Sequence, residues 1–212
     1  SGVFLDNNIS LGHQRLSIID LSEKGRQPIF NEDKSLCLIF NGEIYNFQEL
    51  RNDLEKKGHK FFSKTDSEVV IHLYEEHGED CLQYLNGIFA FAIWDIKKKE
   101  LFLARDRIGI KPLYYYIDPP QTTRRIKRFV FSSEIKAILE HDIKREINLE
   151  ALNHYFRLLY VPAPLTMFKN IYKLPQGHWL KLRAGSARGE VKIERYWDIN
   201  DFKDIGSKEE II

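Results

Sequence analysis

The chain has 212 residues, which is enough for one substantial domain and short for two. Its formal charge of +1 excludes a global field that would attract nucleic acid or a membrane surface. No apolar run is long enough to span a bilayer and no secretory signal opens the chain, so a cytoplasmic location is expected. Two cysteines, Cys37 and Cys81, do not make a disulfide framework, and both are expected to be buried small hydrophobes.

The first half of the chain mixes short strands with helices. Extended segments are predicted at 3–5, 10–19, 36–40 and from 61. Helices are predicted after Asn46, after Thr65-Asp66 and at 81–85. Asn46 has the sequence of a helix N-cap with Glu49 as its capping-box partner, and Gly58 is expected to end that helix.

The second half consists mainly of hairpins. Strands are predicted at 88–94, 100–104, 113–117, 128–131, 172–174, 178–182 and 192–197. Ser133 and Asn148 are expected to cap two further helices, and the second of these carries Leu149, Leu152 and Phe156. The basic run at 124–128 is interpreted as a solvated hairpin loop and not as a nucleic-acid patch. Because strands and helices come in blocks, the pattern favours an α+β fold with two layers of antiparallel sheet.

Several kinds of site are excluded by their missing signatures. The sequence has no glycine-rich phosphate loop and no nucleophile elbow. Its seven histidines do not cluster at metal-ligand spacing, so neither a metal nor a cofactor is expected.

Three short stretches combine polar side chains with the ends of strands or helices. Arg15 could hold a carboxylate through two parallel hydrogen bonds, although a surface or structural arginine is the commoner case. Asn41-Gly42 is a strong turn signal, but the amide and the glycine N–H could also donate to one developing oxyanion. Asp66 could bind an ammonium group, while the helix-cap interpretation is favoured when this stretch is taken alone. Together they would recognise an α-amino acid with a side-chain amide; a nucleophile is absent.

Longer stretches resemble a known family. GHQRLSIIDLS, FNGEIYNFQEL, KTDSEVV, LNGIFAFAIWD and RDRIGIKPLYYY are similar to the glutamine amidotransferase domain of glutamine-hydrolysing asparagine synthetase. SSEIKAIL, KLPQGHWLKL and RYWD continue the resemblance nearly to the end of the chain.

The resemblance implies an N-terminal-nucleophile hydrolase fold, which is a four-layer αββα sandwich of two antiparallel sheets. It implies hydrolysis of glutamine to glutamate and ammonia, and ammonia then serves an ATP-dependent amidation of aspartate. In the family, the stretch of Arg15 holds the glutamine carboxylate, helped by backbone of Leu16, Ser17, Ile18 and Ile19. Asn41 and Gly42 correspond to the oxyanion hole. Glu43 and Asp66 match positions that contact glutamine, and Asp66 does so at the amino group.

Two departures accompany the resemblance. Family members begin with a nucleophilic Cys, whereas Ser1 here aligns with a later strand, so the first strand with the nucleophile is expected to lie outside this chain. The domain is expected at 1–197, and 198–212 is expected to be a linker toward a C-terminal synthetase domain of the same polypeptide, where ATP and Mg²⁺ would bind. A homodimer is one possible assembly. The alternative is a non-catalytic domain of a β-lactam synthetase-type or ammonia-dependent enzyme.

The stretch RDRIGIKPLYYY has a structural alternative of its own. Arg105, Asp106 and Lys111 are interpreted as buried ion partners that fix the sheet, because isolated buried charges are costly and are usually paired.

Overall fold

A computed structural model describes residues 1–15, 25–118, 128–184 and 191–201. Its strands form a six-stranded sheet of order β11-β10-β6-β5-β4-β3, a three-stranded sheet of order β8-β7-β9, and the hairpin β1-β2. All pairs are antiparallel. The strands are β1 (Gly2–Leu5), β2 (Ser10–His13), β3 (Ile29–Phe30), β4 (Leu36–Ile44), β5 (Gly87–Asp95), β6 (Glu100–Arg105), β7 (Tyr114–Ile117), β8 (Phe129–Ser132), β9 (Ile171–Lys173), β10 (His178–Arg183) and β11 (Val191–Arg195).

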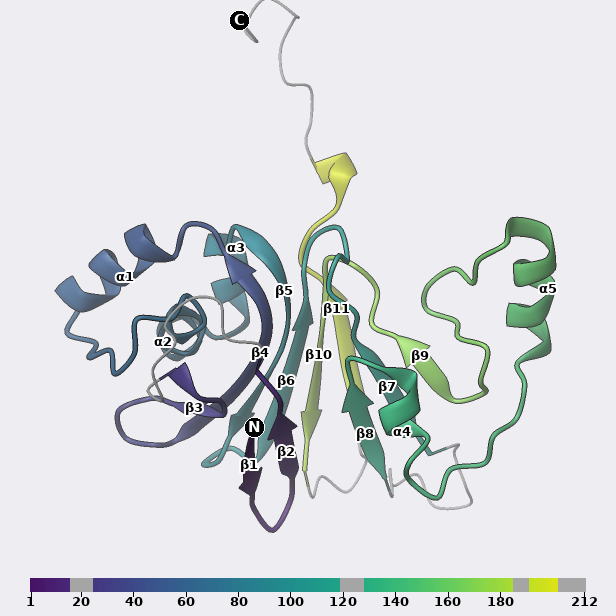
Figure 1. The fold of residues 1–212 in the computed structure, drawn as a ribbon. Coiled ribbons are helices and arrows are strands. Elements are labelled where there is room, and N and C mark those ends of the chain that lie inside the picture. The colour runs from purple at the N-terminus through teal and green to yellow at the C-terminus, as the bar shows by residue number, and fades with distance from the viewer. Residues whose placement is uncertain (16–24, 119–127, 185–190, 202–212) are drawn as a thin grey trace, which may run out of the picture.

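The helices lie on the two outer faces of the paired sheets (Figure 1). On the side of the large sheet lie α1 (Phe47–Lys56), α2 (Glu68–His77) and α3 (Cys81–Tyr84). On the side of the small sheet lie α4 (Ile135–Ile138) and α5 (Leu149–Leu158). Short 3₁₀ turns occur at Gly78–Asp80 and Ile199–Asp201. No helix in the described ranges is long and apolar enough to cross a lipid bilayer.

The alternation of side chains along the central strands explains the four layers. In β5, Phe89, Phe91 and Ile93 pack toward the helices α1–α3, whereas Ala92 and Trp94 face the small sheet. A third cluster lies between the small sheet and α4 (Tyr116, Ile138, Ile143 and Ile171). The predicted α+β arrangement of two antiparallel sheets between helical layers is therefore confirmed.

The prediction of a turn at Asn41-Gly42 was wrong. Strand β4 continues through both residues to Ile44, and Gly42 pairs with Phe89 of β5. A Cβ atom on Gly42 would lie 2.1 Å from the carbonyl oxygen of Ile88, and its φ is +157°. The glycine is required because another backbone approaches closely and not because the chain reverses there.

The helices after Asn46 and Asn148 begin where predicted, but only the second is capped as expected, and Ser133 caps no helix because Glu134 precedes α4. Asn148 accepts hydrogen bonds from the backbone N–H groups of Glu150 and Ala151. Asn46 precedes α1 but makes no capping bond, since its amide instead donates to Tyr84 O and accepts from Asn86 N. The capping box with Glu49 is therefore not formed.

Some element boundaries also differ from the predictions. Strand β2 ends at His13, residues 14–15 belong to no strand, and 16–19 lie outside the described residues. Phe61-Phe62 forms no strand. On α5, Leu149 and Phe156 are exposed by 72% and 74%, so this apolar stripe is not part of the core. Residues 124–127 of the basic run and residues 202–212 likewise lie outside the described residues.

Arg105 and Asp106 have the structural role expected of them, but they bind backbone groups rather than ionic partners. The guanidinium of Arg105 donates to the carbonyl oxygens of Gly109, Lys111 and Leu174. The fully buried carboxylate of Asp106 accepts from four backbone N–H groups, those of Phe89, Ile108, Ile110 and Lys111. These bonds fix the loop between β6 and β7.

Candidate active site

Arg15 leaves the end of β2 and reaches the loop before α2. A Cβ atom added to the buried Gly25 would lie 2.6 Å from a terminal nitrogen of Arg15 and 2.8 Å from Cγ2 of Thr65. The guanidinium and the Thr65 side chain therefore both pack against this glycine. Because Thr65 precedes Asp66, two of the three stretches predicted from the sequence meet here.

Asp66 joins the same region to the end of strand β4. Its Oδ2 accepts a hydrogen bond of 2.9 Å from the backbone N–H of Ile44, and its side chain is buried. The helix-cap interpretation of Asp66 was wrong, since Ser67 precedes α2 and makes no side-chain cap. Burial raises the pKa of Asp66, the N–H of Ile44 opposes that effect, and the charge of Glu43 adds to it.

A buried network of hydroxyl groups holds Asp66 in place. Ser63 Oγ lies 2.7 Å from Thr65 Oγ1 and donates to Glu68 Oε2 at 2.5 Å. Glu68 is 1% exposed and also accepts from the backbone N–H groups of Phe62 and Ser63. Satisfied buried networks of this kind fix one loop conformation, so the position of Asp66 is set by the fold.

Asn41 points to the other side of strand β4. It lines a cavity of about 130 Å³ between the two sheets, together with Gly12, His13 and residues of β5 and β8. The structure thus brings Asp66 to the N–H of Ile44 and places Arg15 beside Thr65 in the same loop, while Asn41 lines the cavity between the sheets. Leu16, Ser17, Ile18 and Ile19 lie outside the described residues.

His13 was not selected from the sequence, although it lies in the same cavity as Asn41. Its Nδ1 is buried and has no hydrogen-bond partner among the described residues. Burial lowers the pKa of His13, so the imidazole is neutral at physiological pH. The signal available in the sequence was its spacing of two from Arg15 at the end of a strand.

The two cysteines are poor nucleophiles, as predicted. Cys37 and Cys81 are both 0% exposed. Burial raises the pKa of Cys37 to about 12 and also raises that of Cys81. A thiol attacks as its thiolate, so neither side chain supplies the missing nucleophile.

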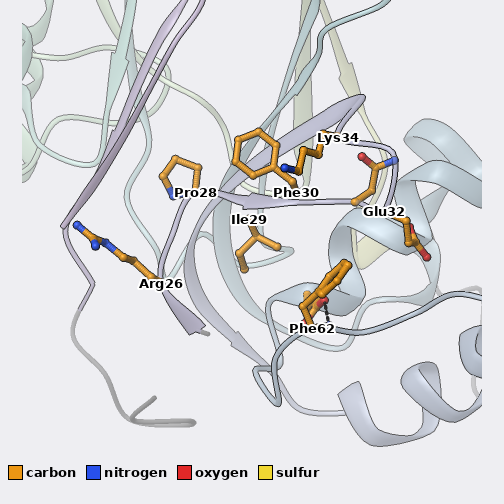
Figure 2. Close-up of a pocket in the computed structure, with 9 residues that line it drawn as sticks. Arg26, Pro28, Ile29, Phe30, Glu32, Lys34 and Phe62 are labelled. Carbon is orange, nitrogen blue, oxygen red and sulfur yellow. Dashed lines mark hydrogen bonds between the residues drawn. The ribbon is translucent and has the colours of Figure 1, made fainter. Parts of the chain in front are cut away.

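A separate pocket of about 240 Å³ opens beside β3 (Figure 2). Its walls come from the segment around β3 and from the loop before α2 (Arg26, Pro28, Ile29, Phe30, Asn31, Glu32, Lys34, Phe62 and Glu68). Among the described residues, none of those proposed from the sequence for glutamine binding lines it.

The comparisons with known proteins identify the family of the chain. A family model described as a glutamine amidotransferase domain matches residues 1–197. The chain therefore belongs to the glutamine amidotransferase domain family. A solved structure of the glutamine phosphoribosylpyrophosphate amidotransferase of Bacillus subtilis, complexed with ADP and GMP, shares the N-terminal-nucleophile hydrolase fold. It has a TM-score of 0.58 and 21% identity, and covers 89% of this chain and 35% of its own.

More similar relatives carry one particular name. Asparagine synthetase (glutamine-hydrolyzing) 3 of Bacillus subtilis is 39% identical over 216 residues, covering all of this chain and 33% of that protein. Asparagine synthetase (glutamine-hydrolyzing) 1 of the same organism is 38% identical over 99% of this chain and 31% of its own length. The chain thus spans about a third of the length of these relatives.

Proposed function

We propose that this chain is the glutaminase part of a glutamine-hydrolysing asparagine synthetase. It would release ammonia from glutamine for an ATP-dependent amidation of aspartate by a synthetase domain on the same polypeptide. The observation that carries the proposal is the identity of 39% over the whole chain to a relative with that name. None of the comparisons favours the β-lactam synthetase-type alternative.

In this proposal Arg15 binds the α-carboxylate of glutamine and Asp66 binds its α-ammonium group. The electrostatics of Asp66 support its part, because burial and the charge of Glu43 both disfavour its negative charge. A bound cation would restore that charge. The packing of Arg15 and Thr65 against Gly25 supports the part of Arg15, since it places a guanidinium next to the Asp66 loop.

Asn41 and the N–H of Gly42 would stabilise the negative oxygen that forms when the side-chain amide is attacked. The attacking thiol would be the family's N-terminal cysteine, outside these 212 residues. Backbone of Leu16, Ser17, Ile18 and Ile19 and the side chain of Glu43 would complete the glutamine site. ATP and Mg²⁺ would bind the synthetase domain, the protein would act in the cytoplasm, and a homodimer stays a prediction.

The test is glutamine hydrolysis by the full-length protein that contains this chain. Arg15→Ala should raise KM for glutamine, with Arg15→Lys in between, because lysine keeps the charge but loses the planar fork. Asn41→Ala should lower kcat by roughly 10²–10³. Asn52→Ala, at an exposed position of α1, is the matched control and should leave both constants unchanged. Wild-type turnover in both Arg15→Ala and Asn41→Ala would refute the assignment.

A further inference from the structure

Four side chains lie together at the edge of the large sheet, apart from the proposed glutamine site. Glu32 follows β3, His59 follows α1, and His72 and Glu75 are one turn apart on α2. One donor atom of each residue lies within 4.8 Å of the donor atoms of the other three. We call these four residues the His–Glu cluster. No metal was expected from the sequence because its histidines do not cluster at metal-ligand spacing, whereas folding brings His59 and His72 together.

His72 is the unusual member of the cluster. Its side chain is 0% exposed, and neither ring nitrogen makes a hydrogen bond within the described part of the chain. Nδ1 lies 3.5 Å from Glu32 Oε2 and 3.9 Å from Glu75 Oε2, which is too long for hydrogen bonds. A fully buried imidazole without hydrogen bonds is costly, and a cation bound among the neighbouring carboxylates would satisfy its inward nitrogen.

The separations fit donor atoms placed around one metal ion. His59 also turns Nδ1 inward, at 3.5 Å from Glu32 Oε1 and 3.8 Å from Glu75 Oε2. Zinc binds histidine nitrogen and carboxylate oxygen at about 2.0–2.2 Å, which places tetrahedral ligands about 3.3–3.6 Å apart. The cluster is an expanded form of that arrangement, because its donor atoms lie within 4.8 Å of one another, and closing the wider separations to tetrahedral values requires side-chain movements of up to about 1 Å.

The outward nitrogens of both imidazoles face carboxylates. His59 Nε2 lies within hydrogen-bond distance of Glu76 Oε1, at 3.1 Å, whereas His72 Nε2 lies 3.9 Å from Glu68 Oε1, which is too long for a hydrogen bond. A carboxylate behind the ring is the usual support of a metal-binding histidine, because it holds the proton on the outer nitrogen and leaves the inner one free to coordinate.

The carboxylates of the cluster are oriented as well. Glu75 Oε1 accepts from the side-chain amide of Asn31, which leaves Oε2 for the cluster. Glu32 Oε1 accepts from the backbone N–H of Lys60, which leaves Oε2 toward His72. Two carboxylates would balance the charge of a divalent ion. Glu32 also lies in the wall of the pocket in Figure 2, which gives solvent a path to it.

We propose that Glu32, His59, His72 and Glu75 bind one divalent first-row transition metal ion, for which zinc is the natural probe. Two nitrogen and two oxygen donors suit zinc, and four protein ligands make a structural and not a catalytic site. The ion would tie the turn after β3 and the segment after α1 to helix α2. Through Glu68 it would also brace the loop that carries Asp66.

The test is zinc binding by the purified metal-stripped protein, measured by titration with zinc chloride against a chelating dye and by thermal unfolding. The wild type should bind one equivalent, and about a hundredfold excess over Kd should raise Tm by roughly 5–10 °C. Cobalt(II) should give the visible absorption of a tetrahedral N/O site. His59→Gln and Glu75→Gln should each weaken zinc binding by more than about 100-fold, since even a supporting partner is worth 10–100-fold.

The matched controls are His77→Gln and Glu55→Gln, which remove the same groups from α2 and α1 outside the cluster, and they should bind zinc as the wild type does. His59 and Glu75 are partly exposed at the chain surface, so both variants should fold, and an unchanged circular dichroism spectrum verifies this. No zinc binding by the wild type would overturn the proposal. Equal affinity in the cluster variants and the controls would overturn it too.

Discussion

Replacing Gly42 by alanine tests the close approach of strands β4 and β5 at the candidate site. The new Cβ atom would lie 2.1 Å from the carbonyl oxygen of Ile88 and 2.7 Å from Cα of Phe89. Both neighbours are backbone atoms of the central sheet, so no flexible side chain can move aside. The strands must separate by about 1 Å at this pair, which is enough to break one or two ladder hydrogen bonds.

The cost can be assembled from its parts. Overpacking costs about 1–3 kcal/mol, a lost hydrogen bond about 1 kcal/mol, and a strained φ about 1–3 kcal/mol. We expect Gly42→Ala to lower the free energy of unfolding by about 3–7 kcal/mol. For a chain of this size that lowers Tm by roughly 6–28 °C. Failure to fold would agree with the same reasoning.

The matched control is Gly12→Ala on strand β2, where an added Cβ would meet nothing within 4 Å. Its Tm should be unchanged or slightly higher, because alanine loses less backbone entropy in a strand. Thermal unfolding followed by circular dichroism measures both variants side by side. A Gly42→Ala variant that melts within about 2 °C of the wild type would refute the steric argument.

Three further predictions follow from buried groups. In urea unfolding, the stability of Asp66→Asn relative to the wild type should increase as the pH rises from about 4 to about 7. The reason is that the raised pKa of Asp66 makes wild-type stability fall as pH rises through it. The opposite trend would contradict this. Asp106→Ala should lower the free energy of unfolding by about 3–5 kcal/mol, since four backbone N–H groups lose their acceptor. The control Asp53→Ala, at an exposed position, should lower it by under about 0.5 kcal/mol. A loss below about 1 kcal/mol for Asp106→Ala would be inconsistent with this reasoning. Cys37 and Cys81 should not react with DTNB until denaturant is added, and a fast-reacting thiol in the folded protein would disprove their burial.

The fold was largely predictable because its signals are local. The hairpin of β5 and β6 follows from two apolar runs around a lysine-rich turn, and Asn148 caps α5 as its sequence indicates. Asn41-Gly42 was mistaken for a turn because the reason for its glycine is Ile88, which lies on a strand far away in the sequence. No rule based on neighbouring residues can distinguish a glycine needed for a turn from one needed for a neighbouring backbone.

The candidate site was predictable in composition and less so in geometry. Arg15, Asn41 and Asp66 were selected as polar residues at the ends of elements. That Asp66 binds the N–H of Ile44 instead of capping α2 depends on tertiary contact across 22 positions. The His–Glu cluster escaped notice for the same reason, since only the pair His72 and Glu75 has a helical spacing that the sequence displays.

At the end of the β4–β5 pair, each strand carries a glycine that lies against the backbone of the other strand. Gly87 pairs with Ile44, and a Cβ on Gly87 would lie 2.2 Å from the carbonyl oxygen of Glu43, just as one on Gly42 would meet Ile88. The backbone of each strand therefore leaves no room for a side chain at the glycine of the other strand. Because the clashing atoms belong to the backbone, no substitution on one strand can compensate for a change on the other. In a saturation mutagenesis library these two positions should be depleted independently of each other, while the exposed Glu43 between them varies freely whenever only folding is selected.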